Sequence, residues 1–76
     1  PIGYVGDTIA DINTVMNAKK EIPSQKFISI GIAPPHLHSK SRLNERNSYE
    51  KILKDAGADL ILNSINDINS INLNLL

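Results

Sequence analysis

The sequence predicts an α/β fold, a three-stranded parallel sheet with flanking helices in the order βαβαβα. Three short apolar runs, at residues 2–6, 26–32 and 60–62, have the composition of buried strands. Amphipathic stretches with helical spacing separate these runs, and crossovers of that length join parallel strands with a right-handed connection. Parallel sheets are normally wider than three strands and buried on both faces. We therefore expect the 76 residues to form a single partial domain, about half of a doubly wound core.

The first strand and helix are predicted from glycine placement and periodicity. Residues 2–6 combine apolar side chains with glycines at positions 3 and 6, as in a short buried strand. From Thr8 the pattern becomes helical, and Pro23 ends the helix because proline lacks an amide hydrogen and restricts the residue before it. The apolar stripe of this helix consists of Ile9, Ile12, Val15 and Met16. The helix dipole favours the basic pair near its C-terminal end, Lys19 and Lys20.

The second strand, residues 26–32, is stopped by Ala33-Pro34-Pro35. The polar segment that follows, residues 36–46, is predicted to be a loop. This loop carries two histidines at i and i+2, His36 and His38. Both are expected to be merely solvated, because no third metal ligand lies nearby in sequence. The basic residues of this segment are interpreted as loop surface rather than as a phosphate site: Lys40, Arg42 and Arg46.

A second helix is predicted to start at Asn47, because Asn47 and Glu50 match the capping-box pattern. Gly57 is expected to end it in a left-handed conformation. Its apolar stripe consists of Tyr49, Ile52, Leu53 and Ala56. After the third strand, a short helix is predicted to begin near Ser64.

Composition and charge exclude several classes of function. Eight basic and eight acidic residues cancel without any block of like charge, which disfavours a nucleic-acid or anionic-membrane surface. No apolar run reaches membrane-spanning length, and no signal-peptide pattern is present. The lack of cysteine excludes disulfides and thiolate metal sites and is compatible with the cytoplasm, where we expect the protein. Glycine-rich nucleotide loops and nucleophile-elbow serines are also absent from the sequence.

One short segment, GDTIAD at residues 6–11, allows two interpretations that do not exclude each other. In the first, Thr8 and Asp11 form a capping box at the start of the helix. In the second, Asp7 lies at the carboxyl end of a parallel strand, where ligands of open α/β sheets bind. Asp7 and Asp11, one helical turn apart, would then face the same point. Two carboxylates with room for water and phosphate suit Mg²⁺.

The GDTIAD segment, directly after an apolar strand, resembles the fourth motif of the haloacid dehalogenase superfamily of phosphohydrolases. The similarity continues through "FISIGIAPP" and "YEKILKDAGADLILNSINDI", so that it covers roughly residues 2–68. The resemblance implies a Rossmann-like hydrolase core in which Asp7 coordinates Mg²⁺ and Asp11 assists through water or by positioning. It also implies a phosphatase that acts on a small phosphorylated metabolite, similar to phosphoglycolate phosphatase.

The rest of that family's machinery does not occur in these 76 residues. The family's nucleophile belongs to an Asp-x-Asp motif, which is absent from the sequence, and its second and third motifs normally precede the fourth. The chain is therefore expected to bind metal, to hold no catalytic residue of its own and to be inactive alone. The rival hypothesis is a non-catalytic, truncated α/β module that acts as an oligomerisation or assembly surface.

The resemblance also implies that the first strand has lost its inner neighbour in the sheet. An open strand edge invites pairing with another chain. The expected partners are a companion with the missing N-terminal half or a second copy paired through residues 2–6. In the complete enzyme, a small phosphorylated metabolite would bind as well.

Overall fold

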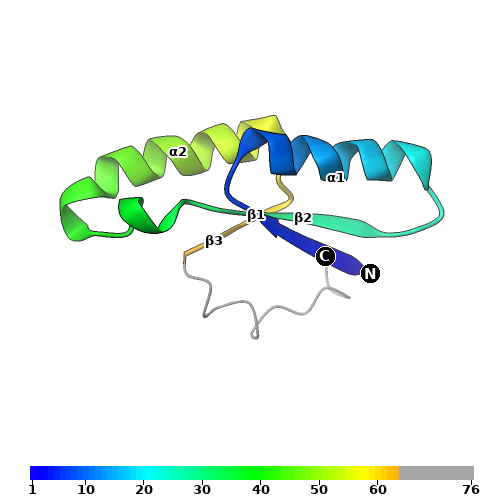
Figure 1. Cartoon of the computed structure of the whole chain (residues 1–76), viewed down its shortest axis with the longest axis horizontal. Coiled ribbons are helices and arrows are strands. Elements are labelled where there is room, and N and C mark those ends of the chain that lie inside the picture. The colour runs from blue at the N-terminus through cyan, green and yellow to red at the C-terminus, as the bar shows by residue number, and fades with distance from the viewer. Residues whose placement is uncertain (64–76) are drawn as a thin grey trace.

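A computed structural model describes residues 1–63 as an α/β unit with a three-stranded parallel sheet (Figure 1). This confirms the predicted fold class. The elements, in chain order, are β1 (Ile2–Gly6), α1 (Ile9–Glu21), β2 (Phe27–Ile32), the 3₁₀ turns η1 (Pro35–Leu37) and η2 (Lys40–Arg42), α2 (Leu43–Ala56) and β3 (Leu60–Leu62). The helix predicted near Ser64 lies outside the described residues.

The strands lie in the order β1-β2-β3, and α1 and α2 cover the same face of the sheet (Figure 1). Successive right-handed crossovers between strands in sequential order place their helices on one face. Gly6 of β1 is level with Gly31 of β2, and Ile32 is level with Leu62 of β3. The carboxyl ends of all three strands therefore meet at one edge of the sheet.

The apolar core is divided between the two faces of β2, as expected for a central strand. Toward the helices, the buried cluster consists of Ile12, Leu53 and Ala58, with Tyr49, Ala56 and Ile61 packed against it. On the opposite face, it consists of Ile28, Ile30 and Leu62, with Ile32 and Leu60 packed against it. Gly31 lets α2 approach the sheet closely, because an added Cβ would lie 3.3 Å from the Leu53 side chain. β2 therefore holds both helices and both neighbouring strands in place.

The second helix begins earlier than predicted. α2 starts at Leu43 after Arg42, so Asn47 lies inside the helix and its predicted capping box with Glu50 is wrong. Glu50 instead accepts a 3.1 Å hydrogen bond from Arg46 one turn earlier. Side-chain pairs of this spacing support a helix and favour the extension over the local capping pattern. Residues 36–46 are therefore not a continuous loop but two 3₁₀ turns followed by the first turn of α2.

Other helix predictions are confirmed with smaller changes. α1 ends at Glu21 before Pro23, and Gly57 ends α2 with a φ of +122°, a conformation that glycine adopts without strain. The apolar stripes are narrower than predicted, since Ile9 and Ile52 are 47% and 48% exposed. Within residues 1–63, no helix has the length and apolar character needed to cross a membrane.

Candidate functional site

A cleft of about 520 Å³ lies at the carboxyl ends of β1 and β2. Its lining residues come from the ends of these strands, the first turn of α1 and η1: Val5, Gly6, Asp7, Asp11, Ile32, Ala33, Pro35 and His38. The predicted site residues Asp7 and Asp11 thus line one cleft, which opens where parallel sheets usually bind ligands.

The capping box predicted at Thr8 and Asp11 is present. The Thr8 hydroxyl accepts a 3.1 Å hydrogen bond from the Asp11 amide, and Oδ2 of Asp11 accepts one of the same length from the Thr8 amide. Oδ2 also accepts a 3.1 Å bond from the Asp7 amide. A single carboxylate oxygen therefore binds two amides that precede the helix, which ties the β1–α1 turn to the first turn of α1.

Gly6 is explained by the close approach of this carboxylate. An ideal Cβ at Gly6 would lie 2.3 Å from the Cβ of Asp11 and 2.9 Å from its Cγ. Real Cβ atoms essentially never approach other atoms within 3.0 Å. The turn between β1 and α1 thus accommodates the Asp11 side chain only because residue 6 has none.

The side chains of Asp7 and Asp11 give one end of the cleft a negative charge. Hydrogen bonds from the side chain and amide of Thr8, together with that from the Asp7 amide, hold the pKa of Asp11 below its usual value. The ion pairs found among residues 1–63 join other residues: Lys19 with Asp59, Arg42 with Glu45 and Arg46 with Glu50. A bound cation would therefore meet two acidic side chains that form no ion pair within the described part of the chain.

Tyr49 of α2 contacts the β1–α1 turn that carries Asp7. Its hydroxyl donates a hydrogen bond to the backbone carbonyl of Asp7, 42 residues away in sequence. Since the Asp7 amide is bound by Asp11, both peptide groups of Asp7 are anchored. The sequence predicted Tyr49 only as part of an apolar stripe, because no local pattern reveals a contact over this separation.

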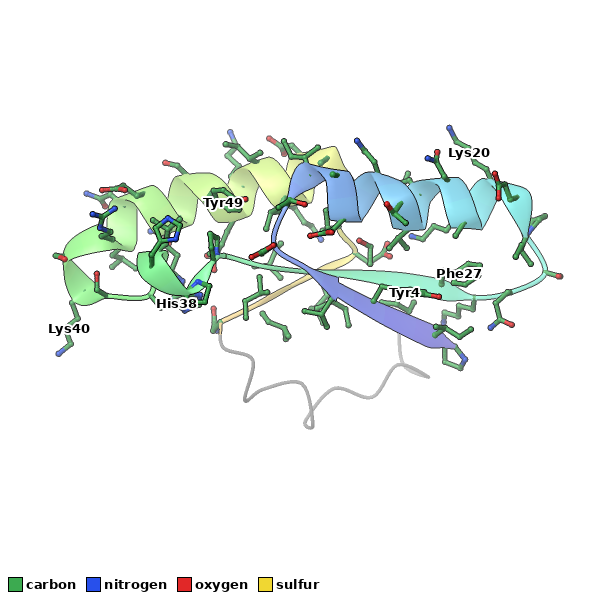
Figure 2. All side chains as sticks on the ribbon, viewed as in Figure 1. Tyr4, Lys20, Phe27, His38, Lys40 and Tyr49 are labelled. Carbon is green, nitrogen blue, oxygen red and sulfur yellow. The ribbon has the colours of Figure 1, made fainter. Side chains whose placement is uncertain are left out.

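His38 is a second residue whose place in the site the sequence did not reveal. His36 is exposed, as predicted, but the prediction of a merely solvated side chain is wrong for His38, which is half-buried and lines the cleft. Its Nε2 lies 2.7 Å from the Ala33 carbonyl oxygen. Figure 2 shows His38 in the segment after β2 and Tyr49 on α2, whereas Tyr4 and Phe27 lie together at a distance from both.

The donor set available to a metal ion is small. Among residues 1–63, no group of three or more His, Cys, Asp or Glu side chains is close enough to hold one. His38 therefore does not complete a three-ligand site with Asp7 and Asp11. One or two protein carboxylates are the ligands typical of an ion that keeps most of its water, such as Mg²⁺.

Comparisons with known proteins leave the family open. The chain matches no protein-family model, no curated protein and no solved structure. The function is therefore inferred from the cleft and the residues that line it.

Proposed function

We propose that this chain provides the metal-binding part of a cytoplasmic phosphatase that acts on a small phosphorylated metabolite. The observation that supports the proposal is the cleft at the carboxyl ends of β1 and β2, which Asp7 and Asp11 line together. Ligands of open α/β sheets gather at this edge, and Mg²⁺ binds through one or two protein carboxylates plus water and phosphate oxygens.

The two carboxylates have different parts in this proposal. Oδ2 of Asp11 is occupied by the amides of Asp7 and Thr8, so Asp11 is suited to hold the ion through water with its other oxygen. Asp7 forms no ion pair within residues 1–63, and we assign its carboxylate as the direct ligand. Mg²⁺ bound here would neutralise the charge of a phosphoryl group.

Hydrolysis needs groups that these 76 residues do not contain. The Asp-x-Asp motif, which carries the nucleophile in the superfamily that GDTIAD resembles, is absent from the sequence. We expect this chain to be inactive alone, with the nucleophile brought by a companion segment. We expect that segment to pair with the free edge of β1, because β1 pairs with β2 on one side only within residues 1–63.

The metal site is tested by titrating the chain with MgCl₂ and following its ¹H–¹⁵N spectrum. Wild type is expected to show saturable shifts centred on residues 6–11. Asp7→Asn should weaken the affinity by roughly tenfold or more, because it removes the direct ligand. Asp55→Asn, which removes the same charge from an exposed site on α2, should leave the affinity unchanged. Equal affinities for wild type and Asp7→Asn would refute the proposal.

A second candidate function, an assembly module without catalysis, is favoured by the surface of β1. This edge strand carries no charged side chain, and its large residues are exposed: Ile2 to 40%, Tyr4 to 49% and Val5 to 36%. Uncharged, apolar strand edges promote pairing between chains. Sedimentation equilibrium of the chain alone, combined with the MgCl₂ titration, distinguishes the candidates, since a tight dimer without Mg²⁺ affinity would favour assembly.

A further inference from the structure

One polar side chain of the cleft takes no part in the proposed metal site. His38 lines the same cleft as Asp7 and Asp11 but does not form a three-ligand cluster with them. It follows the rigid Pro34-Pro35 pair and belongs to the β2 side of the cleft, whereas the carboxylates follow β1. His38 is thus placed to contact a different part of a bound ligand from the part held by the cation.

The hydrogen bond to Ala33 determines which nitrogen of the ring is protonated. A carbonyl oxygen only accepts hydrogen bonds, so Nε2 of His38, at 2.7 Å, carries the hydrogen. In the neutral ring, Nδ1 is then an acceptor. No other hydrogen bond of His38 is formed within residues 1–63. Within the described residues, Nδ1 is therefore available to accept a hydrogen bond from a ligand.

The remaining walls of the cleft are apolar: Val5, Ile32, Ala33 and Pro35. The cleft thus combines an acidic end suited to a cation and its phosphate, walls suited to a short carbon skeleton, and a single acceptor nitrogen. Sites of this kind use a few polar groups to orient a ligand that is otherwise held by apolar contact.

We infer that His38 is a specificity-determining residue, and that its Nδ1 accepts a hydrogen bond from a hydroxyl of a small phosphorylated hydroxy compound. The inference rests on the proposed function, because the phosphate of that ligand is held through the cation at Asp7. It adds the substrate class, a phosphate ester with a free hydroxyl on its carbon skeleton.

The test compares two phosphate esters that differ only in their hydroxyl groups. Glycerol 3-phosphate and propyl phosphate are titrated in the presence of MgCl₂ into wild type, His38→Gln and His36→Gln. Gln at position 38 can still donate to the Ala33 carbonyl through its Nε2, but its acceptor oxygen then branches from the carbon in the place of Cδ2, opposite Nδ1, so no acceptor remains at the Nδ1 position. His36 is the matched exposed histidine of the same segment. Wild type and His36→Gln are expected to prefer glycerol 3-phosphate by roughly three- to tenfold, the effect of one hydrogen bond. His38→Gln should lose this preference.

The outcomes separate the inference from the function on which it rests. If propyl phosphate binds but His38→Gln keeps the preference, or wild type has none, His38 is not the selecting residue. If neither ester binds wild type with Mg²⁺, the proposed function fails, and the inference fails with it. A long-range ¹H–¹⁵N spectrum of wild type gives a second measurement that needs no variant. The Nδ1 signal of His38 should shift with glycerol 3-phosphate and not with propyl phosphate, and an unmoved signal would also overturn the inference.

Discussion

The contact between Gly6 and Asp11 can be tested with a single methyl group. In Gly6→Ala, the new Cβ would lie 2.3 Å from the Cβ of Asp11. That atom is attached directly to the backbone of α1, so a rotation of the side chain does not relieve the overlap. The first turn of α1 and β1 must separate by at least about 0.7 Å to reach the 3.0 Å limit of real Cβ contacts.

The expected cost follows from this overlap. Forcing one methyl group into a packed contact destabilises a protein by about 1–3 kcal/mol. Moving Asp11 also weakens the capping box with Thr8, and losing a helix cap costs about 1 kcal/mol. We expect Gly6→Ala to lower the free energy of unfolding by about 2–4 kcal/mol. For a domain of this size, a loss of 2 kcal/mol lowers the Tm by roughly 8–16 °C.

Urea and thermal unfolding, followed by circular dichroism, measure this effect in a double-mutant cycle. Asp11→Gly removes the Cβ that the new methyl group would meet, so adding Gly6→Ala to it should cost less than about 0.5 kcal/mol. A loss below about 0.5 kcal/mol in the wild-type background would refute the steric explanation. If Gly6→Ala lowered the free energy of unfolding equally in both backgrounds, the requirement for glycine would lie in the backbone conformation of residue 6 and not in the contact with Asp11.

Two further predictions concern contacts that hold the site and the sheet. Tyr49→Phe removes the hydrogen bond to the Asp7 carbonyl and should lower the free energy of unfolding by about 1 kcal/mol, while Tyr4→Phe, at an exposed tyrosine, should change it little in the same urea titration. Partial burial raises the pKa of Asp59, but the hydrogen bonds that it accepts from Lys19 and from the Ser29 amide outweigh burial and hold this pKa below its usual value. Because the folded-state pKa is the lower one, this stabilisation is complete above about pH 5 and is lost as the pH falls through the folded-state pKa. Asp59→Asn should therefore cost less than about 1 kcal/mol near neutral pH, because the Lys19–Asp59 pair is partly exposed. This cost should shrink in acid-unfolding curves as the pH falls below about 5, and a cost that stays constant down to the acid-unfolding transition would contradict the assignment.

Features that depend on neighbouring residues were predictable. The apolar runs at 2–6 and 60–62 are strands, Pro23 follows the end of α1, and Gly57 ends α2 with a positive φ. The capping box at Thr8 and Asp11 was also predicted, because its donors and acceptors lie within one helical turn. Such features arise from backbone geometry and short-range hydrogen bonds, for which the sequence order already places the partners close together.

The start of α2 shows where a local signal misleads. Asn47 and Glu50 match a capping box, but Glu50 binds Arg46, and the helix continues back to Leu43. Ion pairs on one helix face compete with the cap for the same carboxylate. The sequence contained both patterns, and only the packed structure selects between them.

By itself, the sequence determined the fold class, the order of the strands along the chain and the placement of Asp7 and Asp11 at the start of the first helix. The tertiary structure decided which side chains from other elements surround them: the Tyr49 hydroxyl on the Asp7 carbonyl, and His38 folded back onto Ala33 beside the same cleft. The physical reason is the distance along the sequence over which each interaction acts. Helix and strand preferences act over a few residues, whereas the cleft forms only when sheet pairing brings the ends of β1 and β2 level, which no local pattern specifies.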